Sequence, residues 1–151
     1  MEFVVPESLK IEHIELHAEI ENATRTGGKT GVRAKEVVLV LHPHFLKEEE
    51  FALPPLGILR SLADGMINPE MKDVLRLTER LKHDLPVMIR EHEDIVKSLD
   101  ALKIAAREEN KTDFIDLADK LVRHAREEEE VSYPAAILIG EYLKLKMGNP
   151  L

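Results

Sequence analysis

The chain has 151 residues, a formal net charge of −8 and no cysteine. These values exclude disulfides and thiolate metal sites, and the acidic balance argues against a nucleic-acid partner, which needs a basic face. No apolar run approaches the ~18 residues of a membrane span and the N-terminus lacks a signal-peptide pattern, so we expect a cytoplasmic protein with no membrane partner. Apolar residues at 44% and abundant Ala, Leu, Glu and Lys favour one helical domain over residues 1–151.

Three helical segments are expected in the first half of the chain. Pro6 can start a first helix, which ends before the Gly-rich loop 26–31. That loop lacks the Gly-Lys-Ser/Thr ending of a P-loop, which argues against a phosphate site. A second helix is expected over 32–51 before Pro54-Pro55 breaks it, and a short helical piece follows over 56–62.

Longer helices are expected in the second half of the chain. A helical stretch is expected over 69–107, kinked or split at Pro86. A break at 109–111 precedes a helix over 112–131, and a tail helix over 134–147 follows. Four main helices with short connections predict an all-α fold, an up-down four-helix bundle with a short extra C-terminal helix.

One phrase occurs twice in the sequence, once in each half of the chain. HFLKEEEFALP begins at His44 and HAREEEEVSYP begins at His124, and each has Glu four residues and Pro ten residues after the His. Residues four apart share a helix face, so Glu48 lies beside the first His and Glu128 beside the second. Imidazole and carboxylate on one face are a metal-binding arrangement, and a cation compensates both groups when they are buried.

A second motif repeats at nearly the same spacing. Glu12-His13 recurs as Glu91-His92, and this offset is one position shorter than the offset between the two copies of the phrase. The two halves therefore look like a duplicated helical hairpin, whose copies would form a bundle with a pseudo-two-fold axis. Such an axis brings one histidine from each of four helices and two carboxylates to the same depth, which is the ligand set of a dinuclear site. Nitrogen and oxygen ligands without sulfur suit iron, then manganese or zinc.

Together these motifs resemble the hemerythrin-like, HHE cation-binding family over roughly residues 9–136. The resemblance implies a four-helix bundle around a centre of two non-haem iron ions. It also implies two bridging carboxylates, which would be Glu48 and Glu128. The terminal ligands that it implies would be His13, His44, His92 and His124.

The third helix departs from the pattern of the family's oxygen carriers, which have a His-x-x-x-His pair there. Met88 and Val96 stand four residues either side of His92. His17, one turn after His13 on the first helix, is a further candidate metal ligand, although its counterpart in the second half is Val96. The absence of the His-x-x-x-His pair from the third helix argues against reversible oxygen carriage.

Other polar residues near the motifs have simpler interpretations. His42 stands two residues before a proposed ligand and falls on the opposite helix face, which indicates a surface or supporting role. The pattern around His83 indicates an exposed residue. Glu49 and Glu91 are either partners that orient imidazoles or solvated acids. Tyr133 either caps the site or packs against the tail helix, and packing is the favoured interpretation.

The function that these features favour is binding of oxygen, nitric oxide or peroxide at a di-iron site, for sensing, scavenging or redox chemistry. Two alternatives stay open. One is an iron-handling or iron-sensing protein, in which metal occupancy is the signal. The other is a metal-free helical module for protein contacts. The apolar tail helix either covers the bundle or contacts a second subunit, which leaves a homo-oligomer as a further expectation.

Overall fold

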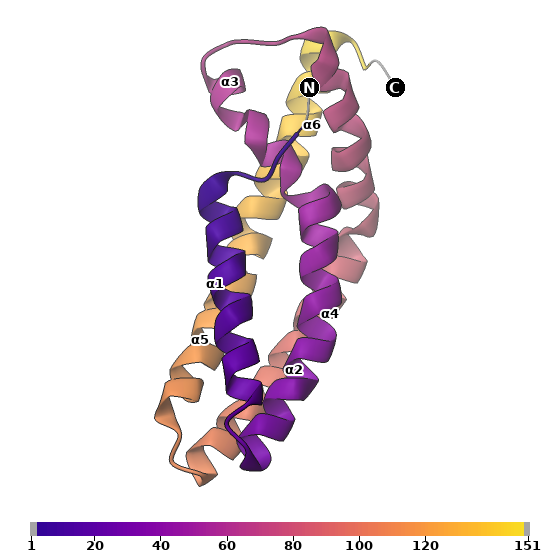
Figure 1. Cartoon of the computed structure of the whole chain (residues 1–151). Coiled ribbons are helices and arrows are strands. Elements are labelled where there is room, and N and C mark those ends of the chain that lie inside the picture. Colours follow the sequence, from indigo (N-terminus) through magenta and orange to yellow (C-terminus); the bar gives the residue numbers. More distant parts are fainter. Residues whose placement is uncertain (1–2, 150–151) are drawn as a thin grey trace.

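A computed structural model describes residues 3–149, and every regular element of that part of the chain is helical. The all-helical prediction is therefore confirmed. Each of the long helices contacts its neighbours in a closed cycle, α1 with α2, α2 with α4, α4 with α5 and α5 with α1 (Figure 1). The bounds of these four packed helices are α1 (Glu7–Thr24), α2 (Gly28–Lys47), α4 (Val74–Glu108) and α5 (Thr112–Glu127).

Two tight turns join these helices at the lower end of the molecule in Figure 1. Between α1 and α2, Gly27 and Gly28 have positive φ values of 76° and 62°, which glycine adopts without steric cost. Between α4 and α5, Asn110 has a φ of 56°. Both turns lie where the sequence predicts them, and α2 begins at Gly28, four residues before its expected start.

Two π-helical turns begin at the glutamate that stands four residues after the histidine of each repeated phrase. The turn η1 (Glu48–Ala52) directly follows α2, and η4 (Glu128–Ser132) directly follows α5. In each, the carbonyl of that glutamate accepts a hydrogen bond from the N–H five residues later, on Leu53 and on Tyr133. Such turns shift the face that a helix presents and are frequent at functional sites.

The two copies of the phrase differ after the proline. The first continues into short elements, which are η2 (Pro54–Ile58), α3 (Leu59–Ala63) and η3 (Pro69–Asp73). The second continues without a non-helical residue into α6 (Tyr133–Met147), with Pro134 in its first turn. A first-turn proline loses no intrahelical hydrogen bond. The expected tail helix is therefore continuous with α5 through η4.

Pro86 does not divide the third long helix. The α4 helix runs over 35 residues with Pro86 inside it, so of the two expected outcomes, a kink or a split, the split is wrong. Pro86 and Lys82 are not buried. The Lys82 carbonyl, which loses its N–H partner to the proline, therefore faces water and can be solvated.

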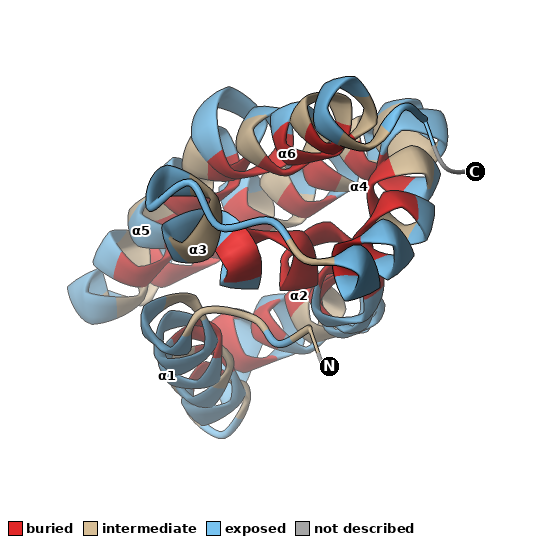
Figure 2. Ribbon diagram, turned by 90° about the horizontal axis from the view of Figure 1, so that it is seen from above, coloured by how far each residue is buried: buried red, intermediate tan, exposed pale blue. Residues whose placement is uncertain are grey.

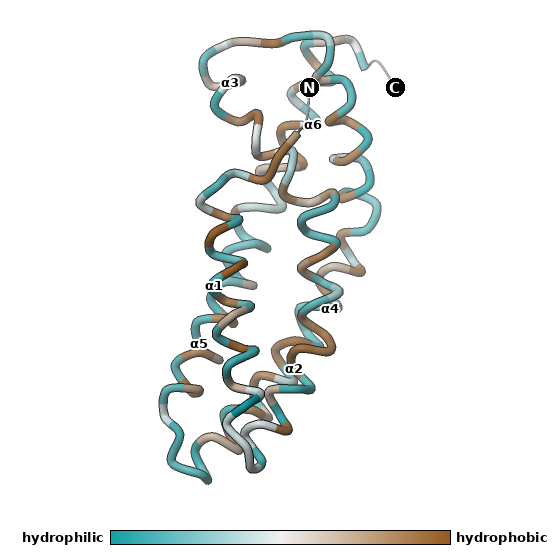
Figure 3. Tube along the Cα trace, viewed as in Figure 1, coloured by the Kyte–Doolittle hydropathy of each residue, from teal (hydrophilic) through white to brown (hydrophobic). Residues whose placement is uncertain are grey.

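The apolar core forms two clusters along the bundle. One cluster includes Leu16 and Leu99, and the other includes Phe51 and Leu75. Figure 2 shows the buried residues on the inward faces of the helices, and Figure 3 shows polar residues interrupting the apolar ones along each tube. None of the described helices is long and apolar enough to cross a membrane.

A polar layer separates the two clusters. On α1, His13 lies between Leu9 of one cluster and Leu16 of the other. On α4, His92 lies between Met88 and Ile95 in the same way. The histidines and glutamates of the repeated motifs therefore meet inside the bundle, with apolar packing on both sides.

Candidate metal centre

Six of the seven predicted ligands are buried in the polar layer and form two groups of converging donor atoms. We call them the α2–α4 group and the α1–α5 group after the helices that carry the histidines. Glu128 belongs to both. The α2–α4 group contains His44, Glu48, His92 and Glu128, and the α1–α5 group contains His13, His124 and Glu128.

In the α2–α4 group, each imidazole faces a glutamate through its Nε2 atom. His44 Nε2 lies 3.5 Å from Glu48 Oε1, and His92 Nε2 lies 3.4 Å from Glu128 Oε1. The first pair is the helical i, i+4 pair of the repeated phrase, which the sequence predicts to share a face. The second pair joins α4 to η4, so tertiary packing completes the group.

In the α1–α5 group, the Nε2 atoms of His13 and His124 face each other at 3.2 Å. Glu128 Oε2 lies 3.5 Å from the first and 3.3 Å from the second. Because Oε1 of the same carboxylate faces His92, Glu128 connects the two groups. Glu48 Oε1 also approaches this group, at 3.8 Å from His13 Nε2.

The Nδ1 atom of every buried histidine faces an outer carboxylate. The distances are 3.1 Å for His44–Glu91, 3.0 Å for His92–Glu129, 2.5 Å for His124–Glu12 and 3.7 Å for His13–Glu49. The last exceeds hydrogen-bond distance, and His13 Nδ1 is buried without a partner. Histidines that ligate metals commonly donate their second ring N–H to a carboxylate, which fixes the ring and its tautomer.

Two of these outer carboxylates were expected and two were missed. The sequence suggested Glu49 and Glu91 as orienting partners, whereas Glu12 and Glu129 were not assigned that role. The duplication carried the signal, because Glu12 is the counterpart of Glu91 in the first half and Glu129 is the counterpart of Glu49 in the second. The outer carboxylates therefore obey the same internal symmetry as the ligands.

The two buried carboxyl groups have opposite pKa shifts. Burial, together with the charge of Glu128, raises the pKa of Glu48 well above its usual range. Burial also acts to raise the pKa of Glu128, but the neighbouring Glu48 carboxyl group and the surrounding imidazoles outweigh it and hold that pKa well below the usual range. Burial alone would lower the pKa of His124, yet Glu128 and Glu12 raise it to about 9. Glu48 and Glu128 thus share one negative charge.

Two oxygen atoms in this layer, Glu48 Oε1 and Glu128 Oε2, are buried and have no hydrogen-bond donor. Buried polar atoms are rarely left unpaired in proteins, and each one costs ~1–3 kcal/mol. Both atoms face imidazole nitrogens, which together with carboxylates make a donor set suited to transition-metal ions. The residues present therefore fit bound cations, and the buried His/Glu groups can hold metal ions.

The hydroxyl of Tyr133 also points into the α2–α4 group. It donates a hydrogen bond of 2.6 Å to Glu48 Oε2 and lies 3.2 Å from the Nε2 atoms of both His44 and His92. Burial, reinforced by Glu48 and Glu128, raises its pKa, so the phenol keeps its proton. Packing of Tyr133 against the tail helix alone is therefore a wrong interpretation, because this residue caps the group.

His17 is the predicted ligand that the structure does not bring into either group. Its Nε2 lies 3.3 Å from Nδ1 of His42, and its Nδ1 lies 3.8 Å from Glu21 Oε1. One helical turn displaces it ~6 Å along α1 from His13, which takes it out of the polar layer. His83 is exposed beside Asp84, as expected.

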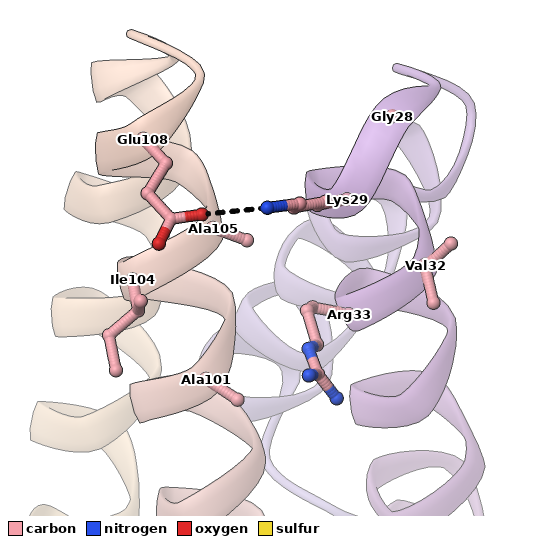
Figure 4. A pocket seen from close by; sticks show the side chains of 8 residues that line it. All are labelled: Gly28, Lys29, Val32, Arg33, Ala101, Ile104, Ala105 and Glu108. Atoms are coloured by element: carbon pink, nitrogen blue, oxygen red, sulfur yellow. Dashed lines mark hydrogen bonds and ion pairs between the residues drawn. The ribbon is translucent and has the colours of Figure 1, made fainter.

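A cavity of about 620 Å³ lies elsewhere, between the start of α2 and the end of α4. Figure 4 shows Lys29 and Glu108 facing each other across it, and their ion pair spans 3.3 Å. The remaining lining is largely apolar or small, with Val32 and Ile104 on opposite sides (Figure 4). The site of chemical interest is therefore the buried layer rather than this cavity.

No family model, curated protein or solved structure matches this chain. The assignment of a metal centre rests on the convergence of the buried donors and on the duplicated sequence motifs that supply them.

Proposed function

We propose that this chain is a single hemerythrin-like domain, an up-down four-helix bundle that holds two non-haem iron ions and binds oxygen, nitric oxide or peroxide at them. The observation that carries the proposal is the shared position of Glu128, whose two oxygens face imidazoles of different groups at 3.3 to 3.5 Å. A carboxylate placed in this way suits a bridge between two cations.

The chain's own residues would divide the work between holding and orienting. His44 and His92 would hold one ion, His13 and His124 the other, and Glu128 both. Glu48 would be the second bridge, since its Oε1 faces His44 at 3.5 Å and His13 at 3.8 Å. The same donors also suit manganese or zinc. When bound, two iron ions would supply open coordination positions and accessible redox states.

The surroundings favour a small ligand. Apolar clusters lie on both sides of the polar layer and limit access of water. Two surface grooves reach the layer from outside, one ending at His13 and the other at His92. Beside the layer, the hydrogen bond from Tyr133 to Glu48 Oε2 holds a proton where a reacting ligand can receive it.

An iron-handling or iron-sensing role is the second candidate, and the buried carboxyl groups favour it. Without a cation, Glu48 and Glu128 keep unpaired buried oxygens, so the metal-free protein should be less stable than the loaded one. Occupancy would then change the state of the fold itself.

Anaerobic loading with ferrous iron, followed by optical spectra with and without oxygen or nitric oxide, separates these functions. Two irons per chain with a spectrum that responds to either gas supports ligand binding. Two irons with no response supports iron handling or sensing. A chain that takes up no iron, with an unchanged melting temperature, would support a metal-free interaction module and overturn both metal functions.

A further inference from the structure

Two grooves on the surface correspond to each other through the internal duplication. The α1–α2 groove, a cavity of about 330 Å³, is lined by residues that include His13 and Glu49. The α4–α5 groove, about 470 Å³, is lined by residues that include their counterparts His92 and Glu129. Each groove therefore leads from the surface to one buried histidine and its outer carboxylate.

Two facing positions are among those at which the grooves differ. His17 and His42 line the first, and the residues at the corresponding positions of the second are Val96 and Val122. The two halves of the chain thus carry a pair of imidazoles in one groove and a pair of isopropyl groups in the other. The imidazole pair is therefore a feature of one groove, and the corresponding helices of the other half pack with valine at both positions.

The geometry of the pair suits a cation. His17 Nε2 and His42 Nδ1 are 3.3 Å apart. Two imidazoles bound to one tetrahedral ion at ~2.0–2.1 Å place their nitrogens ~3.4 Å apart. His17 is 29% exposed and His42 is exposed, so an ion can reach both from solvent.

Two carboxylates lie in the same groove. Glu21 Oε1 is 3.8 Å from His17 Nδ1, and Glu49 Oε1 is 3.7 Å from His13 Nδ1 at the inner end. Both glutamates are partly exposed and can turn toward an ion. The corresponding groove also has carboxylates in its lining, but it has two cationic side chains, Lys97 and Arg126, that the first groove lacks.

We propose that His17 and His42 form a separate surface site for a divalent transition-metal ion, such as zinc or ferrous iron, between α1 and α2. We further assign it the capture of iron for the buried centre, a role that rests on the proposed function. The inner end of the groove is His13, whose buried Nδ1 has no hydrogen-bond partner. An ion held at the surface pair is therefore already in the groove that leads to a ligand of the centre.

The test copies the second groove into the first. His17→Val, His42→Val and the double variant are compared with wild type and with His83→Val, which removes an exposed histidine elsewhere. Iron-loaded protein is dialysed against micromolar zinc, and both metals are counted per chain. We expect one zinc in wild type and in His83→Val, at least tenfold weaker zinc binding in each single variant, and none in the double variant. An equal zinc content in all of these proteins would overturn the site. It would show that the two rings share only an N–H···N hydrogen bond.

The capture role has its own readout, the initial rate of ferrous iron uptake by metal-free protein. We expect uptake several-fold slower in the double variant than in His83→Val, and equal rates would overturn the role while leaving the site. If the buried layer takes up no iron, the proposed function fails. The difference of one zinc per chain between wild type and the double variant still tests whether the surface site exists.

Discussion

The hydroxyl of Tyr133 donates a 2.6 Å hydrogen bond to Oε2 of Glu48, and the two residues come from opposite copies of the duplicated hairpin. Tyr133→Phe removes the hydroxyl that donates to this oxygen inside a buried layer. We expect the free energy of unfolding of the metal-free protein to fall by ~1–3 kcal/mol, measured by chemical denaturation. Tyr142→Phe, at the half-buried second tyrosine, is the matched control and should have little effect.

The same variant tests the position of the hydroxyl beside the metal. Tyr133 Oη lies within 3.2 Å of three proposed donors, so it adjoins any ion that they hold. Tyr133→Phe should keep two irons per chain and change the optical spectrum of the loaded protein, whereas Tyr142→Phe should not. A spectrum identical to wild type would show that the hydroxyl is remote from the iron.

Glu48→Gln tests the second bridge. Because the pKa of Glu48 is raised, its carboxyl group is neutral without metal, and the isosteric amide should leave the metal-free stability near wild type. An amide is a poor bridging ligand, so iron content should fall to one or none per chain. Glu50→Gln, at an exposed residue that pairs with Arg80, should keep two irons. Two irons in Glu48→Gln would remove Glu48 from the ligands.

Glu109, which lies far from the candidate metal centre, makes a pH-dependent contribution to the stability of the fold. Its carboxylate accepts hydrogen bonds from the backbone N–H groups of Lys29 and Thr30 and thereby caps the start of α2. Hydrogen bonds from the hydroxyl and the N–H of Thr30 are the main cause that lowers the pKa of Glu109 from 4.5 to about 2. The folded state therefore favours the ionised form, so this stabilisation is complete above about pH 4.5 and is lost as the pH falls toward 2.

Glu109→Gln should accordingly lower the melting temperature at neutral pH, and its difference from wild type should shrink below about pH 4.5. Glu108→Gln, beside it on the exposed surface, is the control and should show a smaller effect. A difference between Glu109→Gln and wild type that is constant from neutral pH to about pH 2 would show that the cap does not depend on the carboxylate charge.

Gly140 permits the close contact between α6 and α4. A Cβ atom at this position would clash with the side chain of Thr78. Gly140→Ala should destabilise the protein by ~1–3 kcal/mol through overpacking. Thr78→Ala in the same chain should recover part of that loss in a double-mutant cycle, and strictly additive effects would contradict a direct contact.

Local signals in the sequence were sufficient for most helix ends. Gly27-Gly28 and Asn110 mark turns because their positive φ values are costly for most other residues. The split considered at Pro86 does not occur, because the proline costs little where the residue that loses its hydrogen bond is exposed. The continuity of α5 with α6 depends on the π turn that precedes Pro134, and no composition signal identifies such a turn.

The site was predictable where it repeats. The i, i+4 pair His44–Glu48 and its copy His124–Glu128 constrain each other, as do the single histidines of α1 and α4. Residues that depend on tertiary packing were not predictable in the same way. The hydroxyl of Tyr133 reaches the layer from the residue that directly follows η4, a π turn of the kind that shifts a helix face. The pairing of the two imidazoles in the α1–α2 groove depends on how α1 packs against α2.

The count of iron atoms per chain after anaerobic loading with ferrous iron and desalting tests the account most directly. We predict two irons in wild type, together with a higher melting temperature than that of the metal-free protein. We predict none when Glu48 and Glu128 are both changed to Gln. A wild-type chain that retains no iron, or a double variant that retains two, would contradict a centre bridged by these glutamates.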